Sequence, residues 1–324
     1  MRRRHEGDTL GGVLFEFFRT RFDFEAVDSV HFAGGNSTNI LRGAFGMLLR
    51  KVACTSICGA GHDSGCAYAR IFEPRQLRRN GPSGLADWPR PFILRARHLD
   101  GRTLQPAENF HFYIHLFDPQ IPLLTFIDAL KQLATEGLGP RRGRARLAGV
   151  EQLDIDDRVM ARLWNGVDFS PLVASSAAPL DVEPCHAVRV RFLTPTELKC
   201  EGKPVERPEF PVLFARIRDR LSTLRALYGP GPLKVDFGGM GERAAQIRMT
   251  RWELRSEHRV RRSSSTGQVH PWGGFTGEAE YQGDLTEFMP YLHAAQWTGV
   301  GRQTVWGKGE IAVTPSADPL IPGG

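Results

Sequence analysis

The chain has 324 residues, 41% of them hydrophobic, and a formal net charge of +6. This length favours two domains over one, and the hydrophobic content is enough for each to build a core. No run approaches 18 apolar residues and the start, MRRRHEGDTLGG, has no hydrophobic segment. We therefore expect neither a membrane span nor a signal peptide, and predict a cytoplasmic protein.

Arginines concentrate in two separate stretches of this basic chain. Guanidinium groups bind phosphate in a forked geometry, so clustered arginines favour a nucleic-acid partner. A solvated basic face is the alternative interpretation. The clusters are Arg141, Arg142, Arg144 and Arg146, and then Arg248, Arg251, Arg255, Arg259, Arg261 and Arg262.

The first half of the chain shows one strand, one helix, two strands, one helix and a last strand. This order is typical of the ferredoxin-like split fold. The helices are predicted from apolar residues at helical spacing and the strands from alternation, with Asn36, Ser37 and Thr38 as N-cap candidates. The expected elements are a strand within 11–30, a helix over 39–53, strands over 90–97 and 109–118, a helix over 122–135 and a strand over 144–154.

The second half repeats the same order after a stretch without periodicity. Residues 156–186 are rich in prolines and small residues and predict a linker. The expected elements that follow are a strand over 186–199, a helix over 210–228, strands over 244–258 and 273–284, a short helix over 285–296 and a final strand. The sequence thus predicts an α+β protein with two tandem ferredoxin-like (RRM-like) βαββαβ domains, over residues 1–155 and 187–324.

A glycine-rich stretch, TGVGRQTVWGKGEI over 298–311, precedes the final strand. Closely spaced glycines let the backbone approach a ligand, and their N–H groups can point at phosphate oxygens. Arg302 and Lys308 add positive charge to it. A tight connection without any ligand is the alternative.

Three cysteines and a histidine stand at uniform intervals in the first half. Cys54, Cys58, His62 and Cys66 follow the pattern C-x3-C-x3-H-x3-C, and three thiolates with one imidazole suit a tetrahedral zinc ion. Reduced thiols packed as small hydrophobic groups are the competing interpretation. The total of five cysteines is odd, which argues against a disulfide framework.

Five motifs, in this order, give the chain a family resemblance: LRGAFG, CAYARIFEP, GLGPRRGRARL, GGFTGEAEYQGDL and TGVGRQTVWGKGEI. The chain resembles the CRISPR-associated endoribonucleases that cut repeat RNA, the sixth Cas family of the repeat-associated mysterious protein superfamily. The resemblance implies metal-independent cleavage of repeat RNA in precursor transcripts to give guide RNAs. It also implies RNA contact at the glycine-rich loop, by Gly299, Gly301, Arg302, Gly307, Lys308 and Gly309. Thr298 stands where relatives often carry histidine.

Metal-free RNA cleavage by the 2′-hydroxyl needs a base, an acid and cations that stabilise the phosphorane. The resemblance implies a catalytic histidine on or just after the first helix, which points to His62, with His31 second. Arg42 and Lys51 flank this helix and are candidates for charge stabilisation. If zinc binds His62, the same imidazole cannot transfer protons.

The arginine-rich stretch RSEHRVRRSSSTGQVHPWGG has a role in the resembling family, where such a hairpin grips the base of an RNA stem. Here that role would fall on Arg255, Arg259, Arg261 and Arg262, with Trp272 stacking on a base. Two other functions stay open: a non-catalytic RNA-binding subunit of a CRISPR effector complex, and a general RNA-binding protein. The expected partners are repeat RNA or crRNA and CRISPR effector subunits, with no membrane.

Overall fold

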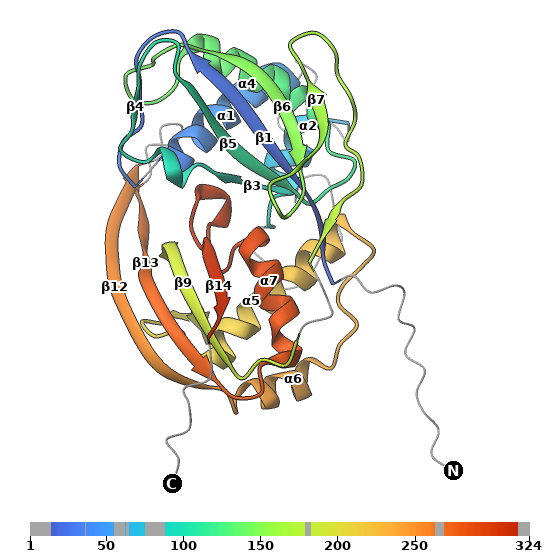
Figure 1. Cartoon of the computed structure of the whole chain (residues 1–324), viewed down its shortest axis with the longest axis vertical. Coiled ribbons are helices and arrows are strands. Elements are labelled where there is room, and N and C mark those ends of the chain that lie inside the picture. Colours follow the sequence, from blue (N-terminus) through green and yellow to red (C-terminus); the bar gives the residue numbers. More distant parts are fainter. Residues whose placement is uncertain are drawn as a thin grey trace.

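The computed structural model describes residues 14–35, 37–54, 62, 65–74, 88–178, 183–262 and 269–316. Two α+β domains lie one above the other in Figure 1, which confirms the predicted fold class. Among the described residues, no helix has the length and apolar character needed to cross a membrane.

The first domain is an antiparallel sheet covered on one face by two helices (Figure 1). Alternation in β1 directs Phe22 and Phe24 into a core with Phe112, Phe45 and Phe126. The sheet order is β3-β5-β1-β6-β7. Its elements are β1 (Glu16–Ala26), α1 (Ser37–Ala53), β3 (Phe92–Arg95), β5 (Asn109–Leu116), α4 (Leu123–Glu136), β6 (Ala145–Leu153) and β7 (Val159–Trp164).

The second domain repeats this arrangement with the order β12-β13-β9-β14. In both sheets the first strand lies between the third and the fourth, which is the ferredoxin-like order predicted from the sequence. Helix α5 begins and ends at the predicted residues. The elements are β9 (Ala187–Thr196), α5 (Phe210–Tyr228), α6 (Phe237–Ala244), β12 (Arg248–Arg262), β13 (Val269–Gln282), α7 (Met289–Thr298) and β14 (Ile311–Pro315).

Short elements fill the connections. The 3₁₀ turns are η1, η2 and η3, and α2 is a helix of six residues. Their bounds are β2 (Val30–His31), α2 (Ala67–Phe72), η1 (Arg97–Leu99), β4 (Thr103–Leu104), β8 (Ser176–Ala177), β10 (Lys199–Cys200), β11 (Lys203–Pro204), η2 (Thr286–Phe288) and η3 (Thr304–Trp306).

The stretch predicted as a linker, 156–186, contributes two strands to the first sheet. Strand β7 pairs with β6, and β8 pairs with β1. Leu163 and Trp164 are buried in the first core, so this part of the stretch is held by packing. Strand β7 does not alternate between buried and exposed residues, and the prolines and small residues that predict a linker lie after it, from Pro171 onward.

Strand β1 supplies both domains with core residues. Phe22 and Phe24 belong to the core of the first domain, whereas Phe15 and Phe17 belong to the core that contains the second domain's helices. The ring of Phe17 stacks on Trp297 of α7 with centroids 5.1 Å apart. The two domains therefore meet at a hydrophobic contact that includes Phe17 and Trp297.

Candidate functional site

The glycine-rich loop runs between the two domains and its backbone requires glycine. Gly309 has a φ of +69°, and a Cβ there would lie 1.9 Å from the Val300 carbonyl oxygen. Gly307 has a φ of +91°, and a Cβ there would lie 2.6 Å from the Cβ of Thr38 in α1. The loop thus packs against the first helix of the other domain.

Lys308 is buried, whereas the sequence predicted that it contacts RNA. Its side chain is fully buried, and Nζ donates to Glu197 Oε2 and to Gln303 Oε1, each at 3.0 Å. Burial lowers the pKa of Lys308, and the ion pair with Glu197 opposes that effect. The positive charge of Lys308 therefore holds the loop in place through Glu197 and Gln303.

Arg302 shares the same carboxylate but is half exposed. Its guanidinium Nη1 lies 2.7 Å from Glu197 Oε1, and its backbone N–H donates to the Glu197 carbonyl. Burial disfavours the charged form of Glu197, but hydrogen bonds from Arg302 and Lys308 outweigh this and lower the pKa of the carboxyl. Glu197 is thus an anionic anchor with two cationic partners.

A cavity of about 460 Å³ lies between the domains beside this loop. Helix α1 contributes Arg42, helix α5 contributes Asp219, Arg220 and Thr223, and the loop contributes residues 301–306. The remaining wall is formed by Trp88, Pro89, Arg90 and Phe92. Four arginines against one aspartate make this a cationic cavity.

The arginines around the cavity are held in place by contacts within the protein. The Arg42 guanidinium lies 4.9 Å from the centroid of the Phe72 ring, and Arg90 Nε donates to the Phe72 carbonyl at 2.9 Å. Arg220 Nε donates to the Thr298 carbonyl at 3.0 Å. The cavity can thus offer oriented cations to an anionic group.

Two arginines near the cavity, the half-buried Arg220 and the buried Arg95, have no carboxylate oxygen within hydrogen-bond distance among the described residues. Burial, and then the charge of Arg95, lower the pKa of Arg220 to about 9. Arg95 is 6% exposed, and its nearest carboxylate oxygen, on Glu310, is 3.8 Å away. Two guanidinium groups that repel each other at an interface favour a bound anion between or beside them.

Among the predicted catalytic residues, Arg42 lines the cavity, whereas Lys51 and His31 do not. Lys51 Nζ instead pairs with Glu136 of α4 at 3.1 Å within the helical layer of the first domain. His31 lies in β2, and its Nδ1 is 2.9 Å from the Thr103 hydroxyl. None of the described residues that line the cavity is a histidine.

His62 is engaged at both ring nitrogens, which argues against its predicted role in proton transfer. Nδ1 lies 3.6 Å from Cys54 Sγ and 3.5 Å from Cys66 Sγ. Nε2 lies 3.2 Å from Glu73 Oε2, and the side chain is only 9% exposed. Cys58, the fourth predicted metal ligand, lies outside the described residues.

Two histidines that the sequence analysis did not select lie together on the free face of the first sheet. His98 Nε2 donates to the His111 carbonyl at 2.8 Å, and the two rings stack with centroids 4.9 Å apart. Burial, followed by the charge of His98, lowers the pKa of His111. His111 and Tyr113 share a face of β5 because successive strand residues alternate, whereas the contact with His98 forms only in the folded domain.

The predicted RNA-binding hairpin is formed by β12 and β13. Arg255 is exposed and opposes Thr276 in the register. Arg259, Arg261 and Arg262 lie in β12 and Trp272 lies in β13, but their side chains are outside the description. Trp252 was missed: it is 42% exposed, with the Arg207 guanidinium 3.8 Å from its ring centroid.

Comparisons with known proteins agree with this architecture. A family model for an N-terminal domain, AF_1859_N, matches residues 15–174, and the model of the CRISPR-associated endoribonuclease Cas6 matches residues 190–311. A search of curated protein sequences returned no match.

Solved structures show the same fold. One Cas6 product complex is 19% identical with a TM-score of 0.54, covering 92% of this chain and 99% of that one. A second is 20% identical with a TM-score of 0.51, covering 93% and 100%. A partial Cas6-RT-Cas1–Cas2 complex is 11% identical with a TM-score of 0.54, covering 94% and 46%. The second domain, residues 190–311, thus matches the family of the CRISPR-associated endoribonuclease Cas6.

Proposed function

We propose that the chain cleaves repeat RNA in CRISPR precursor transcripts without a metal ion, by attack of a 2′-hydroxyl on the adjacent phosphate. The ligands are then repeat RNA before the cut and crRNA after it. Product complexes among the similar structures support this choice of substrate. A Cas6-RT-Cas1–Cas2 complex among them supports CRISPR proteins as further partners.

The cationic cavity beside the glycine-rich loop is the observation that carries the proposal. A phosphorane carries more negative charge than the phosphate it forms from, so fixed cations stabilise the transition state over the ground state. Arg42 and Arg302 approach the cavity from the first helix and from the loop, and Arg220 from α5. We assign these three guanidinium groups to the scissile phosphate.

Proton transfer is assigned in this proposal to His31, which lies outside the cavity lining, so the scissile linkage would have to extend from the cavity toward β2. Thr103 orients the ring through Nδ1, which leaves Nε2 for the 2′-hydroxyl or the leaving 5′-oxygen. His31 lies in the strand that leads to α1, the helix that carries Arg42. The cysteine–histidine group is assigned to structure and not to the cleavage step.

RNA positioning is assigned to the hairpin and the loop. The proposed contacts to phosphates and bases are the predicted Arg255, Arg259, Arg261, Arg262 and Trp272, and the backbone at Gly299, Gly301, Gly307 and Gly309. In Figure 1 the β12–β13 hairpin curves up along one side of the molecule toward the first domain, as an RNA clamp would. Backbone contacts fix register, and few arginines are needed to read bases.

The test is cleavage of repeat RNA in buffer to which no divalent metal ion is added, compared with the same RNA carrying a 2′-deoxy nucleotide at the cut. We expect the first to be cut to a 2′,3′-cyclic phosphate end and the second to stay intact. Arg42→Ala should slow the step by about 100-fold or more, as removal of one transition-state donor does. Arg158→Ala, in the exposed turn before β7, is the matched control. Cleavage of the deoxy substrate would contradict the proposal.

A further inference from the structure

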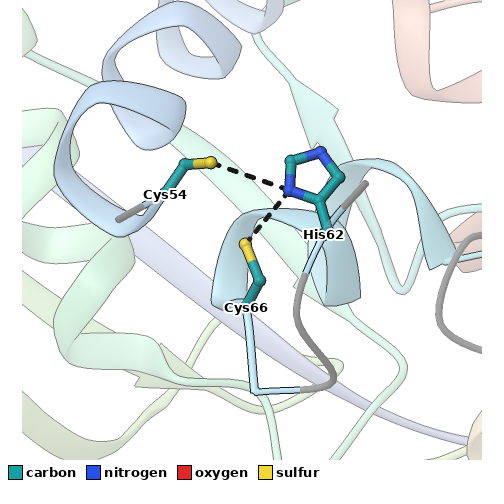
Figure 2. Close-up of side chains that lie close together, drawn as sticks. All are labelled: Cys54, His62 and Cys66. Carbon is teal, nitrogen blue, oxygen red and sulfur yellow. Dashed lines mark hydrogen bonds between the residues drawn. The ribbon is translucent and has the colours of Figure 1, made fainter. Parts of the chain in front are cut away.

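Two cysteines and one histidine converge where helix α1 ends and helix α2 begins. Cys54 follows the last residue of α1, and Cys66 is the N-cap of α2. In Figure 2 both thiols point at the same ring nitrogen of His62. Their ligand atoms all lie within 4.8 Å of one another.

The distances match those between the ligands of one zinc ion. Sulfur–nitrogen separations of 3.6 Å and 3.5 Å join Nδ1 to Cys54 and Cys66. Zinc–sulfur and zinc–nitrogen bonds of ordinary length, at a tetrahedral angle, place these atoms about 3.6 Å apart. Nδ1 has one lone pair in the ring plane and can accept one proton from one thiol. A cation between the three atoms satisfies both sulfurs and the nitrogen together.

The other side of the imidazole is arranged as it is at metal centres. Nε2 of His62 lies 3.2 Å from Glu73 Oε2, and the Tyr68 hydroxyl donates to Glu73 Oε1 at 3.3 Å. A histidine that ligates a metal nearly always donates its second N–H to such a carboxylate, which fixes the ring and raises its basicity. Glu73 thus selects the tautomer in which Nδ1 faces the thiols.

We propose that Cys54, His62 and Cys66 bind a structural zinc ion. Two thiolates and an imidazole are soft and borderline donors, a set that selects zinc over magnesium or calcium. Binding releases the two thiol protons to solvent and needs no other reactant. This inference goes beyond the proposed cleavage reaction, in which no metal takes part.

The ion would tie α2 to α1 and so support the arginines of the cavity. Phe72, at the end of α2, contacts the Arg42 guanidinium through its ring and accepts from Arg90 Nε through its carbonyl. Its ring also lies beneath α1, where a Cβ at Gly46 would be 2.8 Å from Phe72 Cε1. Loss of the ion should therefore loosen α2 and displace Arg42.

The test measures metal and not cleavage, so its failure is separable from failure of the proposed function. The full chain purified without chelator should carry one zinc ion by elemental analysis. Cys54→Ser and Cys66→Ser should each weaken zinc affinity by more than about 10-fold and so lower the zinc content, because even the loss of a ligand's outer hydrogen-bond partner weakens metal binding by roughly 10- to 100-fold. Cys200→Ser, at an exposed cysteine of the second domain, should keep the ion.

A second measurement guards against variants that fail to fold. Cobalt(II) added to the metal-free full chain should give the thiolate charge-transfer band and the intense visible bands of a tetrahedral site. Both should weaken in His62→Ala. A zinc-free wild-type chain that also gives no such cobalt spectrum, or a Cys54→Ser/Cys66→Ser chain that retains zinc, would overturn the proposal.

Discussion

The glycine-rich loop and the β12–β13 hairpin were both predicted to bind RNA, and the structure places their charges differently. In the loop, Lys308 is buried against Glu197 and Arg302 shares that carboxylate. In the hairpin, Arg255 is exposed. A buried cation in a loop can therefore pair with a carboxylate of the same protein. Only arginines and lysines that stay exposed can contact a ligand.

The largest loss of stability should follow removal of the Glu197 carboxylate, which pairs with Arg302 and Lys308 of the glycine-rich loop. Glu197→Ala leaves the Lys308 ammonium buried without its ion pair, and we expect a loss of about 3–5 kcal/mol in the free energy of unfolding. Urea unfolding measures it. The double variant Glu197→Ala/Lys308→Met removes the buried charge as well and should regain most of the loss. Equal destabilisation of both variants would mean that the ion pair is not the anchor.

A methyl group in the loop should have the next largest effect. Gly309→Ala combines a φ of +69° with a clash against the Val300 carbonyl, so we expect a loss on the order of 1–3 kcal/mol. Gly202→Ala is the matched control, because it has a φ of +80° and open space around a Cβ. The stability lost in this control measures backbone strain alone, without a steric clash. If both variants lose the same stability, close packing of the loop is not what requires glycine.

His115, whose ring binds the carbonyl of Trp297 just before the glycine-rich loop, should make stability depend on pH. Its Nδ1 donates to the Trp297 carbonyl at 2.9 Å, and burial, followed by Arg95, lowers the pKa of the imidazole to about 3. The unfolded chain then binds a proton that the folded chain does not. Stability is fully present above pH 6.5 and should fall by up to about 1.4 kcal/mol per pH unit below it.

Urea unfolding between pH 7 and pH 5 tests this dependence. His115→Gln keeps an N–H donor and has no titration, so its stability should vary less over this range. A wild-type chain with the same slope as the variant would exclude His115 as the source.

The smallest effect on stability should come from the hairpin, with the effect appearing in RNA binding instead. Arg255→Ala should leave the urea midpoint unchanged and weaken binding of repeat RNA. The slope of log affinity against log salt should fall by about 0.7–0.9, the value for one lost phosphate contact. Filter binding at several salt concentrations measures it, and Arg158→Ala serves as the control. An unchanged slope would remove Arg255 from the RNA interface.

Local patterns predicted most of the fold because periodicity reports directly on which face is buried. The helix over 210–228 and the order of strands and helices along both domains follow from it. The strand over 159–164 was not predicted because its residues do not alternate between buried and exposed. Packing of β7 on β6 depends on a tertiary contact that alternation does not encode.

The site was harder to predict, because its parts are distant in the sequence. Arg42, Arg220 and Arg302 meet at one cavity only once both domains are folded. Spacing correctly grouped Cys54, His62 and Cys66. It did not show that both nitrogens of His62 are occupied, since Glu73 reaches the ring from the far end of α2.

Strand β1, which sends side chains into two cores, has a mechanical consequence. Phe17 is anchored beneath Trp297 while Phe22 and Phe24 are fixed five and seven positions later in the other core. A hinge between the domains would have to bend a continuous hydrogen-bonded strand. The two domains should therefore keep a fixed relative orientation, and an RNA substrate must change its own conformation to enter between them.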